Sequence, residues 1–185
     1  MVVVLMLSGW ATSGKDAAAS LLVEEAGFLR FAFADALKAD VARTHALPIE
    51  LFHDPATKDQ IIPQKGVSPR KLLLDHARKA RAIDLDVFAR ILVNQVQEAV
   101  VAGVHRIIIS DWRYRREYEY LERKLLGIAT LITCRITRHG VTPSADPSEH
   151  DLDAQPMHAM IDNDGSISDL RDSLKAMLRV QGVLS

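Results

Sequence analysis

Residues 2–16 have the sequence VVVLMLSGWATSGKD, which carries the clearest indication of the fold. Its first half is an unbroken apolar run, which is typical of a strand buried on both faces of a parallel sheet. The run stops at Ser8 and Gly9, and the residues after Lys15 favour a helix that ends at Gly27. The stretch therefore predicts a buried strand, a glycine-containing loop and a helix in direct succession.

The loop, residues 9–15, fits the pattern G-x-x-x-x-G-K of a phosphate-binding loop. In such a loop, backbone N–H groups surround a phosphate, the helix N-terminus adds positive potential, and the lysine reaches the outer phosphates. Glycines are needed where the backbone approaches the ligand or adopts positive φ. The predicted phosphate-binding residues are Gly9, Trp10, Ala11, Thr12, Ser13, Gly14, Lys15, Asp16 and Ala17.

Two carboxylates are candidates for a Mg²⁺ site. Asp16 stands where most such loops have Ser or Thr; it either binds the metal or simply stabilises the helix N-terminus through the helix dipole. Asp111 ends a second apolar run, and the carboxyl ends of parallel strands form the ligand crevice. A plain helix cap is the alternative interpretation of Asp111.

The rest of the chain alternates between predicted strands and helices. The two clearest further strands are 105–111 and 128–136, and a short one is expected at 28–33. Helices are predicted over 36–46, from Pro69 with Ser68 as the cap, over 86–102, from Tyr114 to Leu125, and around Leu170 and Leu174, while 48–69 looks irregular. This order predicts an α/β fold of three layers, α/β/α, around a parallel sheet.

Length and charge narrow the class further. At 185 residues the chain is expected to form a single domain, residues 1–185. A net charge of −1 gives no reason to expect a nucleic acid polymer or a membrane surface as a partner. No run reaches the ~20 apolar residues of a membrane span, and the lone Cys134 is expected to be a buried, reduced thiol, so a cytoplasmic location is predicted.

Phosphoryl transfer needs positive charge on the transferred group, and arginine side chains pair with phosphate oxygens in a bidentate manner. The candidates are Arg70, Arg113 and Arg138, because each begins or follows a predicted element. Most of the other charges between 115 and 124, of both signs, are expected to form a solvated helix face. An exposed helix face is compatible with a homodimer, although nothing in the sequence requires one.

Several segments in order resemble the deoxynucleoside monophosphate kinases of bacteriophages and related P-loop kinases. They are the loop ending Gly14-Lys15-Asp16, then FADALK at 33–38, SPRKLL at 68–73, ISDWRYRRE at 109–117, SEH at 148–150 and IDNDG at 161–165. The resemblance implies a P-loop kinase fold with an acceptor-binding helical insertion over about 36–85 and a short lid over about 138–153. For a phage protein the location is the host cytoplasm.

The resemblance also implies roles for single residues. Asp35 and Lys38 would border the site of the deoxynucleoside monophosphate (dNMP), and Arg70, Arg113 and Glu117 would hold that acceptor. Arg138 would lie in the lid over the ATP phosphates, and Lys15, Arg113 and Arg138 would be the catalytic residues. The implied reaction is Mg²⁺-dependent transfer of the γ-phosphoryl group of ATP to the dNMP.

Alternatives remain at three places. His76-Ala77-Arg78 replaces the Gly-Thr turn expected after the helix beginning at Arg70. A kinase for another small phosphorylated compound or a modified nucleotide is therefore an alternative. A non-catalytic nucleotide sensor is the rival from a different class of protein. Trp10 either stacks on a base or covers the loop.

Overall fold

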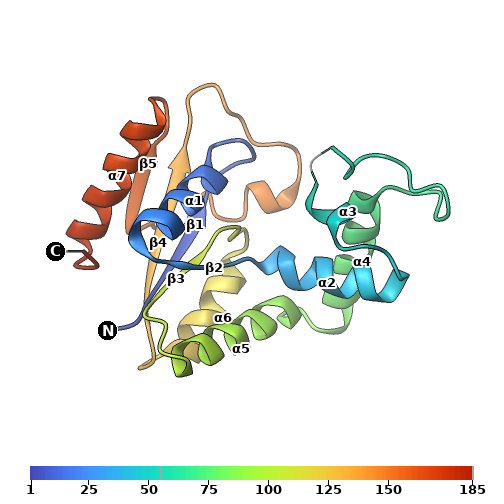
Figure 1. Cartoon of the computed structure of the whole chain (residues 1–185), viewed down its shortest axis with the longest axis horizontal. Helices are drawn as coiled ribbons and strands as arrows, with labels where there is room; N and C mark the ends of the chain where they lie inside the picture. Colours follow the sequence, from blue (N-terminus) through green and yellow to red (C-terminus); the bar gives the residue numbers. More distant parts are fainter. Residues whose placement is uncertain (55, 185) are drawn as a thin grey trace. The chain divides into compact units, whose positions relative to one another are not determined.

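The apolar run near the N-terminus forms the centre of a five-stranded parallel sheet (Figure 1). Strand β1 (Val3–Ser8) is buried along its whole length and pairs with β3 (Arg106–Ile109) on one side and β4 (Thr130–Thr137) on the other. Strand β2 (Leu29–Phe31) lies outside β3, and β5 (Ala159–Asp162) lies outside β4. The predicted parallel α/β architecture is confirmed.

Both faces of the sheet are covered. On one face, alternate residues of β1 (Val3, Leu5 and Leu7) pack with helices α1 (Lys15–Ala26) and α7 (Ile167–Val180) in one apolar cluster. The intervening residues of β1 and β3 are equally buried. Helices α5 (Val87–Val101) and α6 (Arg115–Leu125) contribute further buried apolar side chains, among them Leu121 and Leu125. The architecture is therefore the predicted three-layer α/β/α arrangement.

The computed structural model describes residues 1–54 and 56–184. The chain divides into two compact units, one made of Met1–Ala32 with Val93–Ser185 and the other of Phe33–Leu92. The first contains the sheet and the phosphate-binding loop. The second is helical, with α2 (Phe33–His45), α3 (Glu50–His53), α4 (Pro69–Ile83) and the start of α5.

The helical unit has a small core of its own. Val41 and Ala42 of α2 pack with Phe52 of α3, and leucines of α4 lie against them. Helix α4 begins at Pro69 as predicted, and the Ser68 hydroxyl accepts a hydrogen bond of 3.3 Å from the Lys71 N–H. Local capping chemistry therefore defines this helix start.

The sequence-based element boundaries need four corrections. Strand β2 is only three residues long, and α2 begins at Phe33 rather than residue 36. The stretch 48–69, predicted as irregular, contains the short helix α3. Strand β5 was not predicted, because its four residues are mostly exposed or half-buried at the sheet edge. Among the described helices, none combines the length and the apolar character that crossing a membrane requires.

Candidate active site

The loop between β1 and α1 contains two glycines with positive φ. Gly9 and Gly14 have φ of 141° and 102°, in the region that favours glycine. A Cβ at Gly9 would collide with the Ile136 carbonyl oxygen, and one at Gly14 would collide with the Asn163 side-chain amide. Both glycines of the pattern are therefore required by conformation and by space.

Lys15 begins α1, and its side chain turns back along the loop. The Nζ atom donates hydrogen bonds of 2.6 Å to the Gly9 carbonyl and 2.7 Å to the Trp10 carbonyl. The lysine head group is thereby held over the loop backbone. A cation at this place is suited to binding phosphate oxygens.

Several charged groups gather around this lysine. Burial lowers the pKa of Lys15 below its ordinary value of 10.5, and the positive charge of Arg113 lowers it further. The carboxylates of Glu149, Asp16 and Asp111 act in the opposite direction. Residues from three separate chain segments therefore share one electrostatic environment.

The two predicted metal ligands, Asp16 and Asp111, both contribute to the electrostatic environment of Lys15. Asp16 is exposed in the first turn of α1, and Asp111 follows the end of β3 by two residues. Mg²⁺ is commonly bound by one or two carboxylates together with substrate phosphates and water. The described residues contain no cluster of three or more metal-binding side chains, so a dedicated all-protein metal cage is not formed there.

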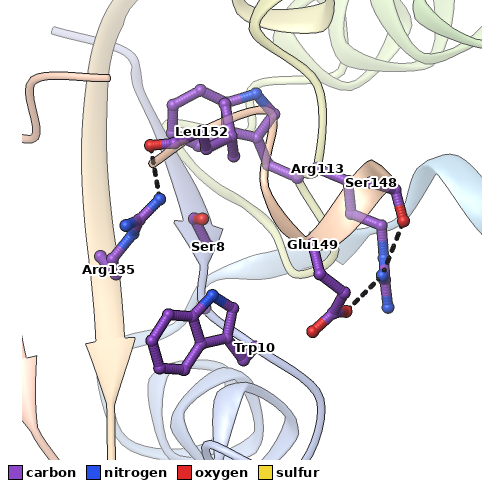
Figure 2. A pocket seen from close by; sticks show the side chains of 9 residues that line it. Ser8, Trp10, Arg113, Arg135, Ser148, Glu149 and Leu152 are labelled. Carbon is purple, nitrogen blue, oxygen red and sulfur yellow. Dashed lines mark hydrogen bonds and ion pairs between the residues drawn. The ribbon is translucent and has the colours of Figure 1, made fainter. Parts of the chain in front are cut away.

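Arg113 lies beside the loop and is held at both ends. Its backbone N–H donates to Glu117 Oε2 at 3.2 Å, and its Nη1 donates to Glu149 Oε1 at 2.6 Å and to Ser148 Oγ at 3.2 Å (Figure 2). The Arg113 side chain as a whole remains 41% exposed. Arg113 can therefore contact a ligand without breaking these bonds at its other atoms.

Glu117 differs from the sequence-based expectation of a solvated helix face. It is buried, and its carboxylate accepts hydrogen bonds from the backbone N–H groups of Arg113 and Tyr114 at the start of α6. Carboxylates at this place satisfy the unpaired donors of a helix N-terminus. The hydrogen bonds give Glu117 a structural task next to Arg113.

The predicted lid, residues 138–153, begins at the end of β4. Arg138 is exposed there, and its carbonyl accepts a hydrogen bond of 3.2 Å from Val141. Near the other end of the lid lies a 3₁₀ helix, η1 (Pro147–Glu149), whose first turn is capped by Asp146. Glu149 at its end is buried, and its Oε2 accepts a hydrogen bond of 3.0 Å from the Ala11 N–H.

A small cavity lies between the loop and the lid end (Figure 2). It encloses about 10 Å³ and is lined by Ser8, Gly9, Trp10, Trp112, Arg113, Arg135, Ser148, Glu149 and Leu152. This volume is at the lower limit for one water molecule, so the cavity is no nucleotide pocket. Trp10 is half-buried on its wall, at the loop.

The predicted acceptor residues Asp35, Lys38 and Arg70 belong to the helical unit. Lys38 Nζ lies 3.8 Å from Asp35 Oδ1 and 3.4 Å from His53 Nδ1. Arg70 is exposed at the start of α4, and its Nη2 donates to Asp59 Oδ2 at 3.1 Å. Lys38 and Arg70 therefore each have an acidic neighbour within that unit.

Two residues near the loop escaped the sequence-based prediction. Asn163, directly after β5, donates a hydrogen bond of 2.9 Å from Nδ2 to the Ser13 carbonyl and is buried. Arg135 on β4 donates to the Leu152 carbonyl at 2.5 Å and fixes the end of the lid. Asn163 belongs to segment 161–165, which was quoted only as part of the family resemblance. Arg135 gave no sequence signal, because it belongs to none of the quoted motifs.

Comparison with known proteins supports the fold. No protein-family model matches the chain, and no curated protein matches it in sequence. The hexameric APS kinase from Thiobacillus denitrificans aligns with 100% of this chain at TM-score 0.51 and 15% identity, and this chain spans only 30% of that longer protein. The protein TT1252 from Thermus thermophilus aligns at TM-score 0.52 and 16% identity over 97% of both chains. The chain therefore shares the fold of these two proteins.

Proposed function

We propose that the protein is an ATP-dependent kinase that phosphorylates deoxynucleoside 5′-monophosphates to diphosphates. The observation that carries the proposal is the set of groups around Lys15. A glycine loop, the lysine, Arg113 and two carboxylates, Asp16 and Asp111, share one environment at the end of a parallel sheet. This combination suits a nucleoside triphosphate with its divalent cation.

In the proposed reaction an oxygen of the acceptor's 5′-phosphate attacks the γ-phosphorus of ATP. The bond from the γ-phosphorus to the β,γ-bridging oxygen breaks as the new P–O bond forms, so ADP leaves and a diphosphate is produced. No covalent enzyme intermediate is needed, because catalysis of this transfer rests on positioning and charge stabilisation. ATP and the dNMP are thus the small-molecule partners of the protein.

The chain's own residues would divide this work. The loop N–H groups and Lys15 would bind the donor phosphates, and Arg113 with Arg138 would stabilise charge on the transferred group. Asp16 and Asp111 would hold Mg²⁺, which when bound neutralises phosphate charge. Segment 138–153 would close over the donor and exclude water, which suppresses ATP hydrolysis.

The helical unit would bind the acceptor through Asp35, Lys38 and Arg70, with Glu117 placing Arg113. His76 in this unit belongs to the segment that departs from the pattern of the monophosphate kinases, and its Nε2 lies 2.6 Å from Asp40 Oδ2. An acceptor screen must therefore extend beyond the common nucleotides.

The test measures ADP formation from Mg-ATP with each deoxynucleoside and ribonucleoside monophosphate in turn, and with phosphorylated sugars. We expect at least one dNMP to stimulate ADP release. Stimulation only by another phosphorylated compound would assign the alternative acceptor class. Nucleotide binding without stimulation by any acceptor would make the protein a non-catalytic sensor.

A matched pair of variants ties the activity to the site. Lys15→Ala should lower turnover by about 100-fold or more, because it removes a cation from the transferred phosphates. Lys124 is an exposed lysine of α6, and its Nζ lies over the Tyr120 ring. Lys124→Ala should leave turnover unchanged. Equal activity of the two variants would remove Lys15 from the mechanism.

A further inference from the structure

Glu149 joins two parts of the sheet-containing unit that are far apart in the sequence. One carboxylate oxygen, Oε2, accepts the hydrogen bond from the Ala11 N–H at 3.0 Å. The other oxygen, Oε1, accepts from Arg113 Nη1 at 2.6 Å. A single side chain therefore bridges the phosphate-binding loop and the arginine that follows β3.

The carboxylate is buried, which makes these bonds consequential. Only 4% of the Glu149 side chain is exposed. A buried carboxylate that lost one of its partners would keep an uncompensated charge in a dry environment, which is strongly unfavourable. The bond to Arg113 is therefore expected to be kept in the folded protein.

The backbone around Glu149 is fixed independently. Asp146 accepts hydrogen bonds from the Ser148 N–H at 2.8 Å and from the Glu149 N–H at 2.9 Å. The carbonyl of Leu152, three residues after Glu149, accepts a hydrogen bond from Arg135. The backbone that carries the Glu149 carboxylate is thus held in place, and so is the position at which the carboxylate contacts the Arg113 guanidinium.

An arginine side chain loses rotamer entropy when it is immobilised. Here Glu117 holds the Arg113 backbone while Glu149 and Ser148 hold one edge of the guanidinium. Much of that cost is therefore met within the folded protein. Such preorganisation is what a charge-stabilising residue requires.

Building on the proposed function, we propose that Glu149 is a positioning residue. Its carboxylate holds the Arg113 guanidinium beside the phosphate-binding loop, so that Arg113 reaches the transferred phosphoryl group already oriented. Glu149 itself does not touch the reacting atoms. The negative charge also offsets the repulsion between Arg113 and Lys15, since Glu149 raises the pKa of Lys15 and Arg113 lowers it.

The first test is a double-mutant cycle in phosphoryl transfer. Glu149→Gln keeps an oxygen for the Ala11 N–H but presents an NH₂ group to Arg113, so it breaks the bridge with little change in shape. We expect kcat to fall by about 10- to 100-fold with the KM for ATP within about 3-fold. In the Arg113→Met background the same change should cost nothing more. Full, independent losses in the double variant would overturn the proposal.

Two further variants control this cycle. Glu119→Gln makes the same chemical change at an exposed carboxylate of α6, which accepts a hydrogen bond of 2.9 Å from Arg115 Nε, and should leave kcat unchanged. Glu149→Asp keeps the charge but shortens the side chain, so it serves if the Gln variant does not fold. Its smaller loss in kcat should likewise vanish in the Arg113→Met background, and persistence of that loss would count against the proposal.

The second test needs no acceptor and so separates this inference from the proposed function. The same double-mutant cycle is measured by denaturant unfolding. Glu149→Gln should destabilise the protein, because it removes one partner of the buried bond to Arg113, and this loss should be smaller in the Arg113→Met background. Equal losses in the two backgrounds would overturn the placement of Glu149, whereas unequal losses in a protein that transfers to no acceptor would refute only the kinase proposal.

Discussion

The side-chain amide of Asn163 donates a hydrogen bond to the Ser13 carbonyl, although the two residues lie 150 positions apart in the chain. The bond ties the phosphate-binding loop to the turn between β5 and α7. The Asn163 backbone N–H is itself bonded to the Thr137 carbonyl at 2.8 Å. The loop is therefore braced against the far edge of the sheet.

Removal of this brace should weaken the protein and its nucleotide binding together. Asn163→Ala deletes a buried hydrogen bond and leaves the Ser13 carbonyl without it, which costs about 1–3 kcal/mol. Denaturant unfolding checks the stability, and calorimetry checks the affinity for ATP. Asn94→Ala, at an exposed position of α5, is the control. Equal stability of the two variants would contradict the bracing role.

Gly14 should tolerate no side chain, for two separate reasons. An alanine there adopts an unfavourable positive φ and its Cβ meets the Asn163 amide. We expect Gly14→Ala to abolish detectable ATP binding. Gly127 also has a positive φ, at 76°, but a Cβ there would meet nothing within 4 Å. Gly127→Ala should therefore cost only about 1–2 kcal/mol of backbone strain.

The double variant Gly14→Ala/Asn163→Ala separates the two causes. It removes the steric conflict and keeps the strained φ, so it should be more stable than Gly14→Ala alone. Thermal unfolding of the four proteins measures the difference. A double variant less stable than Gly14→Ala would show that the clash is not what excludes a side chain.

Nucleotide affinity should begin to decrease at a lower pH than it would with an exposed lysine in the loop. Burial, followed by the charge of Arg113, lowers the pKa of Lys15 below 10.5, so the lysine loses its proton earlier than an exposed lysine does. Binding of a triphosphate needs the charged form, and affinity therefore decreases as pH rises through that lowered pKa. Titration of Mg-ATP between about pH 7 and about pH 10 measures the limb.

Lys15→Arg is the matching variant, because guanidinium stays charged throughout this range. Whatever its affinity at neutral pH, the variant should show a flatter alkaline profile. An identical decrease in both proteins would mean that another group titrates.

Cys134 should be inert in the folded protein. Its side chain is fully buried in β4, and burial raises the pKa of the thiol to about 12. The thiolate is the reactive form, so labelling by a thiol reagent near about pH 8 should proceed only through unfolding. Denaturant should then release one reactive thiol per chain, the single cysteine. Rapid labelling of the native protein would contradict the buried position.

Local patterns in the sequence predicted the elements that local chemistry determines. The apolar run of β1, the glycine loop and the capped start of α4 at Ser68 all depend on residues next to one another. Strand β5 could not be predicted in this way. It is short, it lies at the sheet edge, and exposed residues such as Met160 interrupt its pattern.

The site was predictable to a smaller extent, because its remaining contacts join distant segments. The loop lysine follows from its motif, whereas the bonds of Asn163 to Ser13 and of Glu149 to Ala11 exist only once the sheet has formed. The charge pattern of α6 suggested that Glu117 was solvated, and burial against the N–H groups of Arg113 and Tyr114 overrides that pattern.

Phosphoryl transfer to a deoxynucleoside monophosphate is tested by following the terminal phosphate of ATP labelled at the γ-position. After incubation with Mg²⁺, the protein and a mixture of deoxynucleoside monophosphates, we expect label in a deoxynucleoside diphosphate and its loss with Lys15→Ala. Label confined to inorganic phosphate, or left in ATP after prolonged incubation with every monophosphate, would contradict the proposed kinase activity.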